Sequence, residues 1–157
     1  MTLLDVILAP DIVLKQTCDD VCEFDEAFHT LLKDMFETMY DHNGIGLTAP
    51  QVGVMQRFFI LDVPEKGKDR APLVCVNPSI ECRGDQYESE EGCLSIPGVL
   101  ATVPRYLELK LSAYTENNHF FELEAKGLLA IAIQHEYDHL NGKLITDNPI
   151  KVSSVDN

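Results

Sequence analysis

The stretch Gly127-Leu-Leu-Ala-Ile-Ala-Ile-Gln-His-Glu-Tyr-Asp-His-Leu140 predicts a helix, which Asn141-Gly142 ends. Residues 128–133 of this helix are apolar on every side, so we expect it to run through the buried middle of the molecule. In its second half, His135 and His139 lie four residues apart and therefore share one face. The rest of the fold has to be built around this helix.

These two histidines belong to an HExxH motif, which indicates a metal site. Two imidazoles at helical spacing can bind one ion, and Glu136 between them is placed as a general base. Asp138 could accept a hydrogen bond from a ring N–H, hold another group, or simply be solvated. Two histidines leave a metal ion under-coordinated, so the third ligand decides which kind of hydrolase this is.

The alternative function is a small HExxH metallopeptidase, and the ligands that such enzymes need are missing. The metzincin motif continues with a glycine and then a histidine. This chain has the glycine, Gly142, but Ile145 stands at the position of the histidine. A thermolysin-like enzyme needs a downstream glutamate, and none follows Glu136. Upstream, Cys93 lies between turn-forming residues. One cysteine and two histidines leave the fourth position open, as in catalytic zinc sites.

The composition predicts one soluble domain over residues 1–157. A net charge of −14 argues against binding DNA or RNA through the phosphates. No apolar run approaches the ~20 residues that cross a bilayer, and no signal peptide precedes the domain. The odd count of 5 cysteines favours free thiols. We therefore expect a cytoplasmic protein with no membrane partner.

Hydrophobic spacing indicates an α+β fold. Residues 25–40 have the periodicity of a helix, and Asn43-Gly44 ends it. Residues 58–61 and 73–76 are short apolar runs typical of strands. Alternating apolar positions predict a hairpin of two further strands, 107–113 and 121–125.

Three segments together resemble the signature motifs of the peptide deformylases. They are Gly44–Gln51 (GIGLTAPQ), Glu91–Ser95 (EGCLS) and His135–His139 (HEYDH), and the resemblance runs over residues 3–143. It implies an α+β fold with antiparallel β-sheets packed around a central buried HExxH helix, together with an N-terminal helix. It also implies a reaction in which the N-formyl group is removed from N-formylmethionine at the start of newly synthesised polypeptides, releasing formate.

The resemblance assigns the metal ligands and the catalytic groups. Cys93, His135 and His139 would hold one divalent ion, which is Fe²⁺ in the cell, with Zn²⁺, Ni²⁺ or Co²⁺ as substitutes. Glu136 would accept the proton of the attacking water and return it to the leaving amine. The family's oxyanion donors correspond to the side-chain amide of Gln51 and the backbone N–H of Leu94.

The resemblance also indicates how the substrate is held. Gly44 and Gly46 let the backbone approach the substrate, which the family binds as an added strand. Four further positions correspond to the methionine and substrate pocket, with plain core packing as the alternative for the last two: Ile45, Gly92, Leu128 and Ile131.

Three features depart from the family pattern. Thr48 stands where alanine is usual, and we expect its hydroxyl to bond to nearby backbone with little effect on the chemistry. Leu100 replaces a common arginine, which would change contacts beyond the methionine. Residues 150–157 leave no room for the basic C-terminal helix that docks many bacterial members on the ribosome. Shortened members of this kind resemble those of bacteriophages, which would act in a bacterial cytoplasm.

Overall fold

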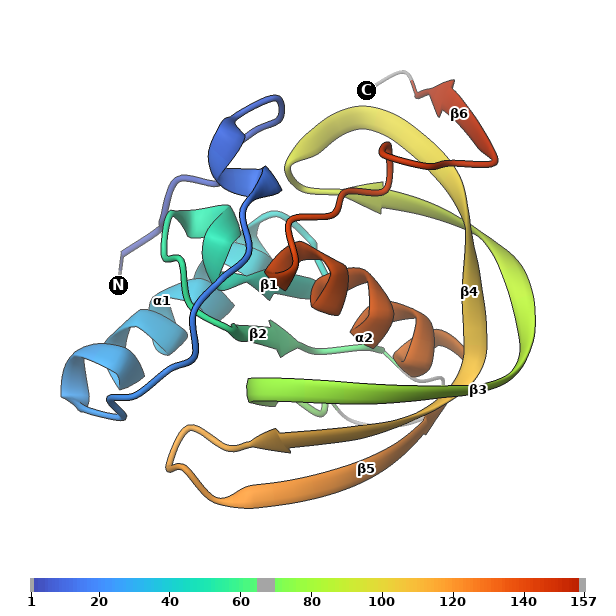
Figure 1. Ribbon diagram of the computed structural model, residues 1–157. Coiled ribbons are helices and arrows are strands. Elements are labelled where there is room, and N and C mark those ends of the chain that lie inside the picture. Colours follow the sequence, from blue (N-terminus) through green and yellow to red (C-terminus); the bar gives the residue numbers. More distant parts are fainter. Residues whose placement is uncertain (1, 65–69, 156–157) are drawn as a thin grey trace.

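The computed structural model describes residues 2–64 and 70–155, and its chain forms a strongly curved sheet with helices on both of its sides (Figure 1). Within these residues the elements are, in order, η1 (Ile12–Lys15), α1 (Glu26–Asp41), β1 (Gly46–Thr48), η2 (Ala49–Val52), β2 (Phe58–Leu61), β3 (Leu73–Cys93), β4 (Ile96–Tyr114), β5 (Phe120–Lys126), α2 (Gly127–Leu140) and β6 (Lys151–Ser154).

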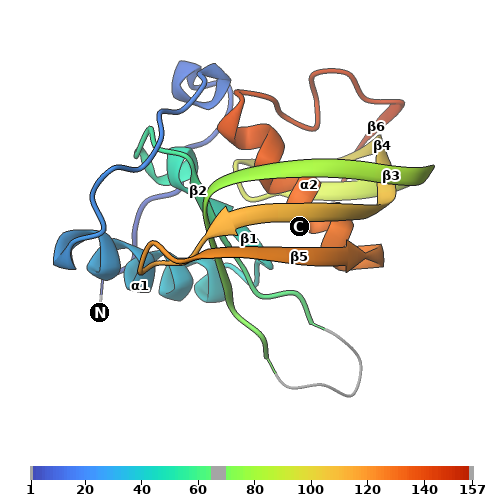
Figure 2. The same cartoon turned by 60° about the horizontal axis from the view of Figure 1, so that its bottom comes forward.

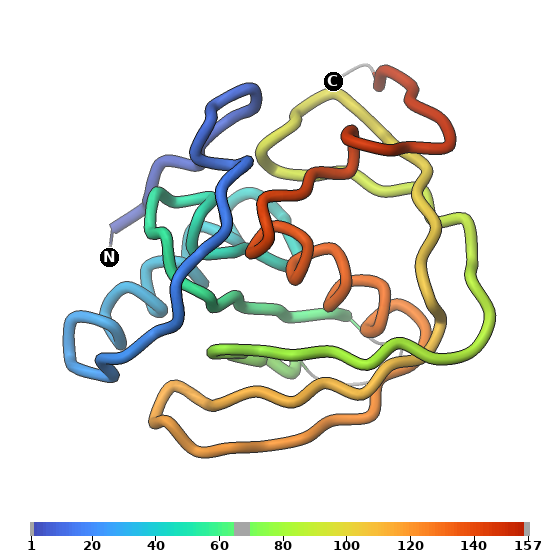
Figure 3. The backbone as a smooth tube through the Cα atoms, in the orientation of Figure 1, coloured from blue at the N-terminus to red at the C-terminus, as the bar shows by residue number. Residues whose placement is uncertain are grey.

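All strand pairs of the described chain are antiparallel and form one 6-stranded sheet in the order β1-β2-β3-β4-β5, with β6 paired to β4. The register between β3 and β4 shifts at three places, and such irregularities bend a strand pair. The trace of the chain shows the bend curving around α2 (Figure 3). The prediction of an α+β fold with antiparallel strands and two helices is confirmed, but one bent sheet takes the place of several separate sheets.

Strand β2 is buried on both faces and separates two parts of the core. Phe58 and Ile60 belong to the cluster that α1 completes, and the rings of Phe28 and Phe58 meet edge to face at 5.0 Å. Phe59 and Leu61 alternate with them and pack in the cluster that contains α2. Helices α1 and α2 therefore pack on opposite faces of β2.

The predicted helix 25–40 is confirmed as α1. The Asp25 side chain accepts a hydrogen bond of 2.9 Å from the Phe28 N–H, which caps the first turn. Its buried face carries Leu32, Met35 and Met39, as the 3.6-residue periodicity predicts.

Helix α2 has the predicted bounds, but its burial differs from the prediction. Ala130 and Ile133 are fully buried, whereas Leu128 is 50% exposed. The first turn of α2 lines a cavity, so its apolar side chains there do not all reach the core. At the other end, the Arg57 guanidinium donates to the Leu140 carbonyl at 3.1 Å and to the Asn141 side chain at 3.0 Å, which ties the last turn to the start of β2.

Two strands are longer than predicted, and two were not predicted. One of these two is β1, which lies in the glycine-rich segment. Residues 73–76 are only the beginning of β3, and the predicted hairpin 107–113 with 121–125 corresponds to the end of β4 and to β5. Residues 151–154 form strand β6, on the edge of β4. All 5 cysteines are free, as the odd count predicts. None of the helices in residues 2–64 and 70–155 has the length and apolarity that crossing a membrane requires.

Candidate metal centre

Cys93, His135 and His139 come together as a cluster of metal-ligating side chains. One ligand atom from each lies within 4.8 Å of the others, and Sγ of Cys93 is 3.4 Å from Nε2 of His139. Cys93 is the last residue of β3, and both histidines lie on α2. The hairpin between β3 and β4 thus presents the thiol to the helix face that carries the imidazoles.

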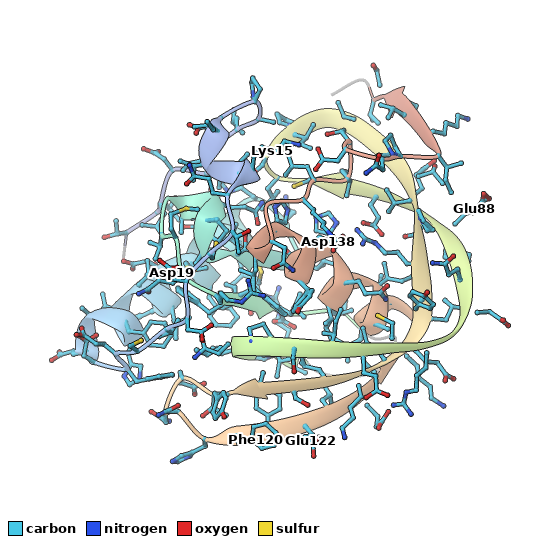
Figure 4. All side chains as sticks on the ribbon, viewed as in Figure 1. Lys15, Asp19, Glu88, Phe120, Glu122 and Asp138 are labelled. Carbon is cyan, nitrogen blue, oxygen red and sulfur yellow. The ribbon has the colours of Figure 1, made fainter. Side chains whose placement is uncertain are left out.

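A buried carboxylate orients one of the imidazoles. Nδ1 of His135 lies 2.8 Å from Oε1 of Glu91, which leaves Nε2 of the ring for the cluster. Arg105 donates two hydrogen bonds of 2.9 Å to the same carboxylate and a third, of 2.7 Å, to Asp138. Asp138 therefore holds Arg105 and not a ring N–H. It lies on α2, within the curve of the sheet, whereas Glu88 points outward from the bend (Figure 4).

The cluster has the chemistry of a site for a divalent cation. One thiol and two imidazoles are the ligand set that zinc and other borderline-soft metals prefer. His139 is 2% exposed, and within the described residues its Nδ1 is a buried polar atom without a hydrogen bond. Bringing these groups together in a nearly dry place is costly unless an ion compensates for it. The residues fit a metal ion of this kind.

Burial and neighbouring charges move the pKa values of the two histidines in opposite directions. Burial and the nearby charges of His135 and Arg105 lower the pKa of His139 to about 3. Burial also acts to lower the pKa of His135, but Glu136, Cys93 and Glu91 outweigh it and raise that pKa well above its usual value. At neutral pH His139 is therefore a neutral imidazole with a lone pair to donate.

Glu136 lies beside this cluster and is not one of its ligand groups. Its side chain is buried against Gly46, where an added Cβ would lie 2.6 Å from Oε2 of Glu136. Burial raises the pKa of Glu136 to about 7, although His135 acts to lower it. A carboxyl group with this pKa can both accept and release a proton near neutral pH.

Gln51, on η2, has its amide fixed from both ends. Oε1 accepts hydrogen bonds of 3.0 Å from the backbone N–H and the hydroxyl of Thr48. Nε2 consequently points to Ser95, at 3.1 Å from Oγ, and lies 3.7 Å from Sγ of Cys93. The Thr48 side chain forms a capping box with the backbone of Gln51, as predicted, and its hydroxyl also bonds to a candidate catalytic side chain.

The N-terminal segment holds both loops of the site in place, a role that the sequence did not indicate. The Ile7 N–H donates to the Gln51 carbonyl at 2.7 Å, and the Ala9 N–H donates to the Ser95 carbonyl at 2.8 Å. These backbone bonds join the two segments that carry Gln51 and Cys93. No side-chain pattern marks such contacts in a sequence.

A cavity of about 490 Å³ opens beside the cluster. The ligands Cys93 and His135 line it together with Glu136, whereas His139 lies behind them. Every other residue that the resemblance assigned to the site also lines this cavity: Gly44, Ile45, Gly46, Gln51, Gly92, Leu94, Leu128 and Ile131.

Comparison with known proteins places the chain in a family. The family model described as polypeptide deformylase matches residues 3–154. A peptide deformylase of Clostridium botulinum is 48% identical over 141 residues, which cover 90% of this chain and 92% of that protein. A peptide deformylase of Hahella chejuensis is 46% identical over 148 residues, covering 94% of this chain and 87% of that protein. The chain belongs to the peptide deformylase family.

Solved structures of peptide deformylases have the same fold. That of Legionella pneumophila superposes with a TM-score of 0.87 at 42% identity, covering 93% of this chain and 85% of the other. That of Thermotoga maritima has a TM-score of 0.88 at 35% identity and covers 100% of both chains. A third, of Synechococcus elongatus in complex with actinonin, has a TM-score of 0.88 at 41% identity and covers 94% of this chain and 79% of the other.

This family member is a hydrolase that removes the N-formyl group from formylmethionine in a metal-dependent reaction. The sequence motifs indicated the residues that line the cluster and the cavity, but not the groups around them. Glu91 could have been found, because it begins the same EGCLS segment that contains Cys93. Arg105 gave no local signal, because only the curvature of β4 brings it to Glu91.

Proposed function

We propose that Cys93, His135 and His139 hold one divalent metal ion and that Glu136 beside them is the acid–base group of the deformylation reaction. The observation that supports this most strongly is the cluster itself, whose ligand atoms lie within 4.8 Å of one another at the wall of a cavity that also contains Glu136. The ion in the cell is Fe²⁺, and Zn²⁺, Ni²⁺ or Co²⁺ can take its place. A divalent ion bound there acts as a Lewis acid and lowers the pKa of a water molecule.

Glu136 moves the protons. Its carboxylate accepts a proton from the water that attacks the formyl carbon, and then delivers that proton to the nitrogen of the departing amine. With its pKa raised to about 7 by burial, the group can serve in both directions near neutral pH. Gly46 keeps the carboxylate on the cavity side, because a side chain at this position would occupy its space.

Gln51 and Leu94 stabilise the oxyanion that develops on the formyl oxygen. The Gln51 amide is held with its N–H groups toward Cys93, because both donors of Thr48 bond to its oxygen. Leu94 follows Cys93 in the turn between β3 and β4, so its backbone N–H lies next to the ligand. Donors that are fixed before the reaction stabilise the transition state without reorganisation.

The cavity holds the formylated end of the polypeptide. Gly44 and Gly46 offer main-chain groups to an extended substrate, in the manner of an added strand. The methionine side chain lies in the apolar part of the cavity, which is lined by Ile45, Gly92, Leu128 and Ile131. Leu128 is 50% exposed at the start of α2, which supports a role in the pocket over the alternative of core packing.

We further propose that residues 1–157 form a single catalytic domain that acts on nascent polypeptides in a bacterial cytoplasm, including that of a phage-infected cell. The residues before the end of the described chain form strand β6 and not a helix. That no C-terminal helix docks the protein on the ribosome remains a prediction. Absence of DNA and membrane partners also remains a prediction.

The test is formate release from formyl-Met-Ala-Ser by the protein loaded anaerobically with Fe²⁺, or with Ni²⁺. We expect stoichiometric formate and a free amino terminus, and inhibition by actinonin. Cleavage of an internal peptide bond with no formate would instead indicate a metallopeptidase. That outcome is disfavoured because Ile145, at the position of the missing ligand, is buried with Ala101 and Val103.

A further inference from the structure

The cavity extends beyond the catalytic groups to the end of the described chain. Strand β6 pairs with the free side of β4, with Leu100 opposite Ser153 and Val99 opposite Ser154. The ladder continues past β6, because the Val155 N–H donates to the Gly98 carbonyl at 2.8 Å. Figure 1 shows β6 beside β4, and Figure 2 shows it in a second orientation.

Val155 is part of the wall of the same cavity that contains Cys93 and Glu136. Val99 and Leu100 line it next to Val155, and Leu100 lies over Gly92, where an added Cβ would be 3.6 Å from Cδ2 of Leu100. Val99, Leu100 and Val155 therefore form an apolar part of the cavity wall near the assigned substrate residue Gly92. Val152 is similarly exposed but is not among the cavity residues, because alternate strand residues face opposite sides.

We propose that Val155, together with Leu100, forms a subsite for the second and third residues after formylmethionine and favours apolar side chains there. This inference rests on the proposed function, since the formyl carbon has to lie at Cys93 and Glu136. An extended polypeptide advances about 3.3 Å per residue, so these residues lie about 7–10 Å further along the cavity. Leu100, which lies over Gly92, and Val155 provide the apolar wall of the cavity on this side.

Acidic residues are disfavoured in this subsite as well. Glu90 lines the cavity and is exposed, and the chain as a whole carries a net charge of −14. An acidic substrate side chain would lose water to an apolar wall and meet a like charge. The order of preference at the third position of the substrate is therefore leucine, then lysine, then aspartate.

The experiment compares kcat/KM for formyl-Met-Ala-Leu, formyl-Met-Ala-Lys and formyl-Met-Ala-Asp in the metal-loaded full chain. We expect the wild-type protein to favour leucine over aspartate at least about threefold, the effect of burying part of one apolar side chain. Val155→Asp should lower the leucine-to-lysine ratio about fivefold, because an added carboxylate attracts the lysine. Val155→Ala should lower the leucine-to-aspartate ratio without reversing any preference.

The matched control is Val152→Asp, which places the same charge three residues earlier, on β6, at a position that does not line the cavity. It should leave all three rates and their ratios unchanged. Equal ratios in the wild type and both Val155 variants would overturn the subsite, as would equal shifts in Val155→Asp and Val152→Asp. Thermal unfolding of each variant shows whether the substitution has disturbed the pairing of β6 with β4. If Val155→Asp disturbs it, the comparison of Val155→Ala with the wild type still tests the subsite. If no formate were released from any peptide, the proposed function itself would be contradicted. Formate release from all three peptides at one rate would contradict only the proposed subsite.

Discussion

Because Gly46 has no side chain, the Glu136 carboxylate can lie beside the cluster of Cys93, His135 and His139. A Cβ at position 46 would lie 2.6 Å from Oε2 and 2.8 Å from Cδ of Glu136, and 2.9 Å from Cδ2 of Leu61. We expect Gly46→Ala to push the carboxylate away and to lower kcat by about 100-fold, the usual effect of displacing a catalytic group by about 1 Å. Steady-state kinetics of formate release measures this.

Gly44→Ala is the matched comparison, because it adds the same methyl group to the same segment. Its Cβ would lie 3.1 Å from Cδ1 of Leu94, the end of a flexible side chain that can move. The loss of kcat should therefore be much smaller than for Gly46→Ala. Equal losses in the two variants would mean that the segment tolerates no side chain at all and that the contact with Glu136 has no special role.

Thr48 should contribute to the rate through the orientation of Gln51. Thr48→Val removes one of the two hydrogen bonds to Oε1 of Gln51 at nearly constant volume. A bond of this kind contributes about 1 kcal/mol, so kcat should fall about fivefold with KM nearly unchanged. Thr48→Ser keeps the hydroxyl and should restore kcat. An unchanged kcat in Thr48→Val would show that the backbone N–H alone holds the amide.

Individual site residues could be predicted from sequence where the chemistry sets their spacing. His135 and His139 follow from helical geometry, and Cys93 was the remaining candidate for a third ligand. The resemblance supplied Gln51 and the pocket residues, all of which line the cavity. The bond between Thr48 and Gln51 was not predictable, because it depends on the turn that η2 makes. Arg105 was missed because its partners are distant in the sequence.

The two ends of α2 are set by glycines with left-handed backbone conformations. Gly127 has φ of 61°, and an added Cβ would have nothing within 4 Å. Gly142 has φ of 72°, and an added Cβ would lie 2.4 Å from the Lys15 carbonyl oxygen. Gly127→Ala should therefore cost only the conformational strain, about 1–2 kcal/mol. Gly142→Ala adds a clash with backbone, and should cost at least about 3 kcal/mol. Urea unfolding of the two variants measures the difference, and similar losses would contradict it.

The helices were predicted more accurately than the strands. Both helices have the periodicity and end signals that fix their bounds, and α2 begins and ends at the predicted residues. Strand β3 was predicted only as far as residue 76, because the segment beyond it is largely exposed and has weak alternation. Strand β6 has no apolar face to bury, and only its pairing with β4 makes it a strand.

Across the whole molecule, Arg105 joins the sheet to the helix. It links Glu91 on β3 to Asp138 on α2, and both Arg105 and Glu91 are less than a tenth exposed. Burial lowers the pKa of Arg105, but the two carboxylates outweigh it and raise that pKa above its usual value. Arg105→Met would leave the buried Glu91 carboxylate with only His135 as a partner, and breaking a buried pair in this way typically costs about 3–5 kcal/mol.

Lys110→Met provides the control on the same strand. Lys110 pairs with Glu122 at 2.7 Å, but both side chains are exposed, so its loss should hardly change the free energy of unfolding. Urea unfolding of the metal-free protein gives both values. A similar small change in the two variants would mean that the Arg105 network does not hold the sheet against α2.

In the proposed reaction Glu136 acts as a base beside three ligands and is not a ligand itself. The direct measurement is the metal content and the formate release of Glu136→Gln, determined on the same anaerobic preparation next to wild type and Cys93→Ala. We predict about one ion per chain in the wild type and in Glu136→Gln, with formate release in the latter reduced by at least about 100-fold, and little or no ion in Cys93→Ala. Loss of the ion from Glu136→Gln, or formate release by it at the wild-type rate, would contradict the account.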